Sequence, residues 1–167
     1  MTVVIDTNVV LVANGQHGEV SPDCVATCAL RLQATMHRGR IALDGAYLIL
    51  AEYQRKTRHV GGRRPGDAFV KWALQNNANP RRCDLVKLEV DAAKGFQTFP
   101  DDSRLSSFDP SDRKFVATSR AHPLQPPILQ AADSKWIDWA AALHENGVFV
   151  EFICRSDVER FREQRVR

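Results

Sequence analysis

The stretch that decides the fold is residues 1–8, Met1-Thr-Val-Val-Ile-Asp-Thr-Asn8, in which an apolar β-branched run ends at Asp6. Such a run predicts a buried strand, because branched side chains pack well on a pleated surface. Residues 126–133 repeat the pattern: Pro-Pro introduces Ile-Leu-Gln-Ala-Ala, and Asp133 closes the segment. Two buried strands, each followed by an acid, suggest a sheet with carboxylates along one edge.

Outward from these two segments, strand and helix patterns alternate. Strands are expected at residues 3–5, 40–43, 85–90, 128–131 and 148–153, and helices at residues 22–38, 46–58, 67–76, 109–121 and 134–144. This alternation predicts an α/β fold, a three-layer α/β/α sandwich around a mostly parallel sheet. Without a convincing linker, residues 1–154 are expected to form one domain, and residues 155–167 a charged helical extension.

The composition suits an ordinary globular chain of 167 residues, with 44% apolar and 26% charged residues. No apolar run is long enough to span a bilayer and no secretory signal is recognised, so we expect a cytoplasmic protein without membrane contact. The cysteines (Cys24, Cys28, Cys83 and Cys154) are scattered, and we expect buried thiols rather than a disulfide framework. A zinc site on the Cys24 and Cys28 pair would need two further ligands.

Four acids are candidates for a common site. Asp6 and Asp133 follow strands, and functional groups in open parallel sheets gather at the carboxyl ends of strands. Glu52 interrupts an apolar helical run, where an acid needs a partner. Asp112 lies in the first turn of an expected helix. Clustered carboxylates repel one another, and a hard divalent cation such as Mg²⁺ or Mn²⁺ supplies the missing positive charge.

Each acid also has a simpler interpretation. Asp6 could be a turn residue and Glu52 a solvated helix position, and Asp112 could serve only the helix dipole. Asp109 is best explained as the N-cap of the helix that Pro110 opens, and it counts among the supporting residues of the site.

Taken in order, the motifs resemble those of PIN-domain nucleases. The resemblance lies in Asp6-Thr7-Asn8 after the first strand, Leu50-Ala51-Glu52-Tyr53, the segment from Asp112 to Ala121, and Ile128 to Ser134. It covers about residues 2–153. One departure is Lys135, at a position where some relatives carry another acid; this suggests fewer metal ligands or a direct phosphate contact.

The resemblance implies a metal-dependent endoribonuclease in which Mg²⁺ or Mn²⁺ activates water to hydrolyse RNA. It assigns catalysis and metal binding to Asp6, Glu52, Asp112 and Asp133, with Thr7, Asn8 and Ser134 as supporting polar groups. The family includes toxins of toxin–antitoxin pairs and host-defence nucleases. The partners it implies are RNA, an antitoxin or other regulatory protein, and a second copy in a homodimer.

A basic segment between residues 55 and 82 contains a single acid, Asp67. Such a surplus suits phosphate contacts, although a solvated helix and loop face explains it equally well. The candidate nucleic-acid contacts are Arg55, Arg58, Arg63, Arg64 and Lys135.

Two alternatives to the endoribonuclease stay open at this stage. One is a catalytically degenerate PIN domain that binds RNA or protein without cutting. The other is a structure-specific DNA nuclease, with single-stranded DNA as a ligand. Phosphatases, nucleotide-binding folds and serine hydrolases are disfavoured because their Asp-x-Asp, glycine-rich and Gly-x-Ser-x-Gly motifs are absent.

Overall fold

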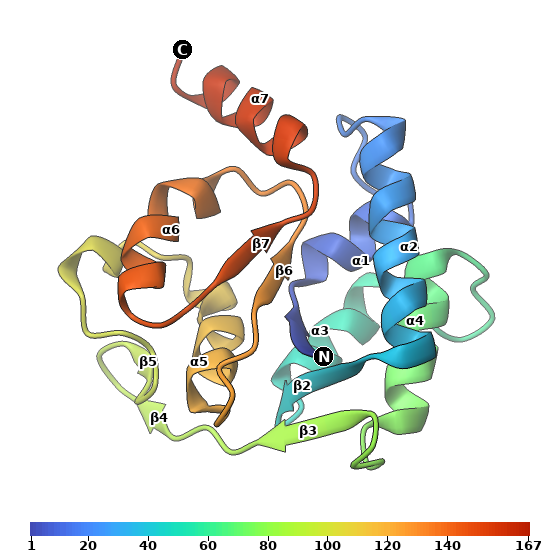
Figure 1. Cartoon of the computed structure of the whole chain (residues 1–167), viewed down its shortest axis with the longest axis horizontal. Helices are drawn as coiled ribbons and strands as arrows, with labels where there is room; N and C mark the ends of the chain where they lie inside the picture. Colours follow the sequence, from blue (N-terminus) through green and yellow to red (C-terminus); the bar gives the residue numbers. More distant parts are fainter.

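A parallel five-stranded sheet forms the centre of the computed structural model, which describes residues 1–167 (Figure 1). Its strand order is β3-β2-β1-β6-β7. The strands are β1 (Thr2–Ile5), β2 (Arg40–Asp44), β3 (Cys83–Val86), β6 (Ile128–Gln130) and β7 (Val150–Phe152). A separate antiparallel hairpin joins β4 (Val90–Asp91) to β5 (Gly95–Phe96). The α/β fold with a parallel sheet is confirmed.

Helices cover the sheet on both sides (Figure 1). They are α1 (Thr7–Ala13), α2 (Pro22–Arg38), α3 (Leu48–Lys56), α4 (Pro65–Asn76), α5 (Arg113–Ala121), α6 (Lys135–Glu145) and α7 (Arg155–Arg165). Helices α1, α2 and α4 pack together on one side of the sheet, and α5 and α6 lie on the other. None of the seven combines the length and apolar composition that crossing a bilayer requires.

The order in which the chain adds strands to the sheet reverses between β1 and β6, although all the strands are parallel. From β1 the chain proceeds outward to β2 and β3, whereas β6 adjoins β1 on the opposite side and leads outward to β7. The amide of Asp6 donates to the carbonyl of Leu129 at 3.0 Å, which holds the two strand ends together. Connections that leave neighbouring strands toward opposite faces open a crevice at their carboxyl ends, where α/β proteins bind ligands.

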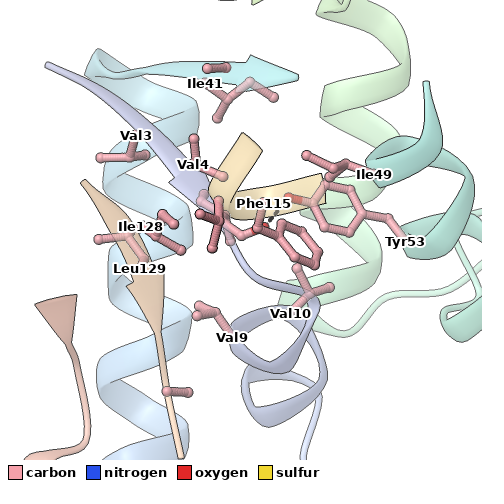
Figure 2. Packing of buried hydrophobic residues seen from close by; sticks show 14 of the residues in the cluster. Val3, Val4, Val9, Val10, Ile41, Ile49, Tyr53, Phe115, Ile128 and Leu129 are labelled. Atoms are coloured by element: carbon pink, nitrogen blue, oxygen red, sulfur yellow. Dashed lines mark hydrogen bonds between the residues drawn. The ribbon is translucent and has the colours of Figure 1, made fainter. Parts of the chain in front are cut away.

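The core is built around β1, which is buried on both faces. Figure 2 shows Val3 and Val4 among side chains from β2, β6, α1, α3 and α5. Tyr53 of α3 is buried and its hydroxyl donates to the carbonyl of Ile5. This bond fixes α3 against the end of β1, one residue before Asp6.

Helix α1 is an element to which the sequence analysis assigned nothing. Asp6 is its N-cap: the Oδ1 atom accepts a hydrogen bond from the Asn8 amide at 2.7 Å. The simple turn considered for Asp6 is therefore the start of a helix. The helix is stabilised by burial, because Val9, Val10 and Val12 are fully enclosed.

The start of α3 depends on Asp44, a fully buried acid at the end of β2. Its two carboxylate oxygens accept hydrogen bonds from the amides of Leu48 and Ile49 at 2.8 and 2.9 Å. Tyr47, the residue before Leu48, takes a left-handed backbone conformation with φ 60°. Asp44 is thus a capping residue that orients α3, and with it Glu52.

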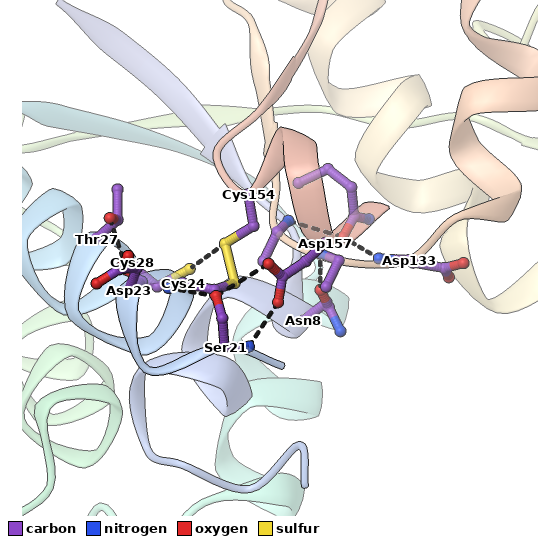
Figure 3. The surroundings of a disulfide bond; sticks show 12 residues. Asn8, Ser21, Asp23, Cys24, Thr27, Cys28, Asp133, Cys154 and Asp157 are labelled. Carbon is purple, nitrogen blue, oxygen red and sulfur yellow. Dashed lines mark hydrogen bonds between the residues drawn. A yellow bond between two sulfur atoms is a disulfide. The ribbon is translucent and has the colours of Figure 1, made fainter. Parts of the chain in front are cut away.

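Two of the four cysteines form a disulfide, so the prediction of free thiols was wrong for Cys24 and Cys154 (Figure 3). The bond joins α2 to the start of α7 across 130 residues of sequence. Asp157 reinforces this junction by accepting from the amide and hydroxyl of Ser21 at 2.6 and 2.9 Å. Cys28 and Cys83 remain buried thiols, and the Cys28 Sγ lies 3.8 Å from that of Cys154.

We expect reduction of the Cys24–Cys154 bond to destabilise the protein by about 4–5 kcal/mol, since the bond closes a long loop in the unfolded chain. Urea unfolding with and without a reductant measures this. The double variant Cys24→Ala/Cys154→Ala is the control, because the reductant has nothing to cleave in it. Equal wild-type midpoints in both buffers would refute the prediction.

Candidate metal centre

Three carboxylates meet at the crevice beside β1 and β6. Oxygens of Asp109, Asp112 and Asp133 lie within 4.8 Å of one another. Asp133 follows β6, and Asp112 ends a short 3₁₀ helix (Pro110–Asp112) that leads directly into α5. Asp109 was expected to be the N-cap here, but its side chain makes no capping hydrogen bond. It instead belongs to the acidic group, with its Oδ2 3.4 Å from the Lys135 ammonium.

Asp6 lies beside this group and is 5% exposed. Burial raises the pKa of its carboxyl well above the usual value, and the charges of Asp112, Asp133 and Glu52 raise it further against the opposing Asn8 amide bond. Its second oxygen, Oδ2, is buried without any hydrogen-bond partner. An unpaired buried carboxylate oxygen is costly, so this atom calls for a proton or a cation.

The grouped acids show the same excess of negative charge. Burial, together with the charges of Asp133 and Glu52, raises the pKa of Asp112 to about 6. The pKa of Asp133 is also raised, mainly by burial, although the Lys135 amide donates to its Oδ1 at 3.1 Å. The ionised forms of these acids destabilise one another, which a divalent cation would reverse.

Glu52 is also buried, but it already has a counter-charge. Its Oε1 accepts from the Lys114 ammonium at 3.2 Å, and its Oε2 accepts from the Thr7 hydroxyl. Lys114 donates in addition to the carbonyl of Ser111. Glu52 differs from Asp6 in that its charge is already compensated, and as a metal ligand it would have to give up the Lys114 ammonium.

Lys114 is the residue that sequence reasoning missed. It is only 9% exposed, although a lysine in the first turn of a helix is ordinarily solvated. A detectable signal is its position between Asp112 and the buried Phe115, on a helix that also buries Val116 and Ala117. A charged side chain so close to an apolar face needs a partner, and here that partner is Glu52.

The other predicted supporting residues hold the segment that carries Asp133. Asn8 accepts from the Ala132 amide at 2.8 Å, linking α1 to the loop after β6. The Ser134 hydroxyl accepts from the Arg165 guanidinium at 3.3 Å, linking the same loop to α7. Both side chains thus act on the position of the carboxylate.

The predicted arginine contacts line a second cleft between the end of α3 and the start of α4, and none of the acids of the candidate metal centre lines it. Its walls include Arg55, Arg58, Arg63 and Arg64. Arg64 forms an ion pair with the buried Asp67 at 2.9 Å, so its guanidinium stabilises the fold and is not free to contact a phosphate. The other three arginine side chains form no ion pair within the protein.

The donor set fits a hard divalent cation. All candidate ligands are carboxylate oxygens, the type that Mg²⁺ and Mn²⁺ prefer. Oxygens of Asp109, Asp112 and Asp133 lie close enough together to share one ion, and Asp6, beside them, would add its unpartnered Oδ2 as a further ligand. The unpartnered Asp6 Oδ2 is the feature that a cation explains best.

Comparisons of the chain with protein-family models, curated proteins and solved structures found no match. The resemblance to PIN domains therefore stays a prediction.

The raised pKa of Asp112 makes a pH-dependent prediction. The pKa of the Asp112 carboxyl is near 4 in the unfolded chain and about 6 in the folded protein. The folded protein therefore loses stability as the pH rises through this range, because the carboxyl ionises more readily in the unfolded chain. Without metal, Asp112→Asn should raise stability at pH 8 by about 1–3 kcal/mol, at about 1.4 kcal/mol per pKa unit, and much less at pH 4.5. Thermal unfolding in EDTA measures both, with the exposed Asp101→Asn as control. A variant equally destabilised at both pH values would contradict this.

Replacing Lys114 should make the stability of the protein depend more strongly on a bound cation. In Lys114→Met, Glu52 is left buried and unpaired, and we expect a loss of about 3–5 kcal/mol in EDTA. Mn²⁺ should restore more stability to this variant than it adds to the wild type, because Glu52 becomes available as a ligand. Thermal melts across a Mn²⁺ titration test this, and identical Mn²⁺ responses would count against it.

Proposed function

We propose that the protein is a metal-dependent nuclease that hydrolyses phosphodiester bonds of RNA, with Mg²⁺ or Mn²⁺ held by Asp6, Asp109, Asp112 and Asp133. The observation that supports this most strongly is the buried, unpartnered Asp6 Oδ2 beside two further acids of raised pKa. These groups lie at the sheet reversal, where open α/β sheets carry their sites.

The chain's own groups have distinct parts in this proposal. A divalent cation, when bound, polarises the scissile phosphate, activates water and stabilises the leaving oxygen. Asp6 is held in place by the α1 amide, and Asp133 by the Lys135 amide, so both are preorganised. The Lys135 ammonium, half-exposed beside Asp109, would contact a phosphate oxygen.

RNA is favoured by the motif resemblance, and a nucleic acid in general by the cleft of Arg55, Arg58 and Arg63. Unpaired guanidinium groups there would hold the phosphate backbone, which fixes position rather than sequence. A toxin or host-defence nuclease restrained by an antitoxin fits the same proposal.

A second candidate function follows from the Lys114–Glu52 ion pair. A site in which lysine already neutralises one acid has less need of a metal, which suits an RNA-binding module that does not cut. The cleavage experiment separates the two functions.

Purified protein with Mn²⁺ should cleave single-stranded RNA, and EDTA should abolish the cleavage. Asp6→Asn should lower the rate by about 10²–10³-fold, the usual cost of losing one group that stabilises transition-state charge. Asparagine can keep the α1 cap, so the fold should survive. Gel-resolved cleavage rates provide the measurement, with single-stranded and flapped DNA as alternative substrates.

Asp101→Asn is the matched control, since it removes an exposed carboxylate outside the site. Preferred cleavage of flapped DNA would transfer the proposal to a DNA nuclease. RNA binding with equal background cleavage by wild type and Asp6→Asn would establish the binding module instead.

A further inference from the structure

A cleft of about 490 Å³ lies beside Asp133, on the side toward α7. Its volume is within the range of sites for small organic ligands. The lining residues come from α1, the segment before α2, the loop after β6, and α7. Among them are Asn8, His17, Asp133, Phe161, Gln164 and Arg165.

The α7 wall of this cleft is fastened at both ends. At its start, Cys154 is bonded to Cys24 and Asp157 accepts two hydrogen bonds from Ser21 (Figure 3). At its end, Arg165 pairs with Asp138 of α6 at 2.7 Å and contacts Ser134. The charged C-terminal helix therefore forms a fixed wall beside the acidic site, and the cleft is preformed.

The cleft combines aromatic rings with free amide groups. The rings of His17 and Phe161 stack with centroids 5.6 Å apart and an interplanar angle of 28°. The His17 Nδ1 is buried without a partner. The side-chain amide of Gln164 and the Nδ2 of Asn8 form no hydrogen bond within the protein. Rings that stack and amides that donate or accept at base edges are what proteins use to bind unpaired bases.

The charges in the cleft disfavour a free anion as its ligand. Asp133 and Glu19 both line it, and they oppose the single positive charge of Arg165. A base carries no charge, so it can enter between the aromatic pair and the amides without meeting this repulsion. Arg165 uses its Nε and Nη2 atoms to contact Ser134 and Asp138, which leaves its Nη1 atom for the phosphate or ribose that accompanies the base.

From this we infer that the cleft binds one nucleotide of a single-stranded RNA, the nucleotide next to the phosphate held at Asp133. Its base would contact the His17–Phe161 pair, and Gln164 and Asn8 would face its edge. This inference rests on the proposed nuclease function and adds the part of the substrate that the C-terminal helix recognises.

The test measures binding of a fluorescein-labelled single-stranded oligoribonucleotide by anisotropy in EDTA, where no metal is available for cleavage. His17→Ala should weaken binding about 10-fold, in the range found for loss of one stacking contact. Arg165→Ala should also weaken it. Arg162→Ala is the matched control for Arg165, because Arg162 also pairs with Asp138, at 2.9 Å, but does not line the cleft.

Affinities that are unchanged in His17→Ala and Arg165→Ala would overturn the inference, as would equal losses in Arg165→Ala and Arg162→Ala. Competition identifies the ligand part: uridine or adenosine should displace the oligonucleotide better than inorganic phosphate. The reverse order would show an anion site and refute base recognition.

Cleavage by the same preparations in Mn²⁺ separates this inference from the proposed function. Cleft-dependent binding without cleavage would support the nucleotide site and contradict the nuclease. Cleavage of RNA together with an affinity that the cleft substitutions leave unchanged would support the nuclease and contradict the nucleotide site.

Discussion

The rest of this structure depends on the repulsion between the buried Asp6 and the half-buried carboxylates of Asp112 and Asp133, which lie beside the ends of β1 and β6. Asp6, Asp112 and Asp133 each have a raised pKa, and burial is the leading cause in every case. The neighbouring Glu52 is relieved by Lys114, but no cationic side chain reaches Asp6 Oδ2. A fold that keeps such an atom unpaired sacrifices stability there, as functional sites commonly do.

The surrounding structure holds these charges in place against their repulsion. The sheet reversal brings the ends of β1 and β6 together, and Tyr53 binds α3 to the end of β1. Asp44 is equally buried, yet it is satisfied by two helix amides and takes no part in the site. Asp44 ends β2 and Asp6 follows the neighbouring parallel strand β1, so the two acids differ mainly in their hydrogen bonding.

Much of this arrangement follows from local sequence pattern. The β-branched run before Asp6 predicted a buried strand with an acid at its carboxyl end, and the structure has both. Asp109 was assigned to the helix cap because a cap signature is local, whereas its approach to Asp133 depends on the tertiary fold. The Lys114–Glu52 ion pair and the Cys24–Cys154 bond were not predicted for the same reason, because the two residues of each pair are 62 and 130 positions apart in the sequence. Spacing along the chain does not identify the two partners of such a pair.

The most direct measurement is a crystal structure of the protein soaked in Mn²⁺, with the ion located by its anomalous scattering. A peak is expected at the crevice, about 2.1 Å from oxygens of at least three of Asp6, Asp109, Asp112 and Asp133, a distance typical of hard divalent ions of this size. The absence of an anomalous peak from the crevice of a crystal soaked in excess Mn²⁺, or peaks only at other places, would contradict a metal site formed by these acids.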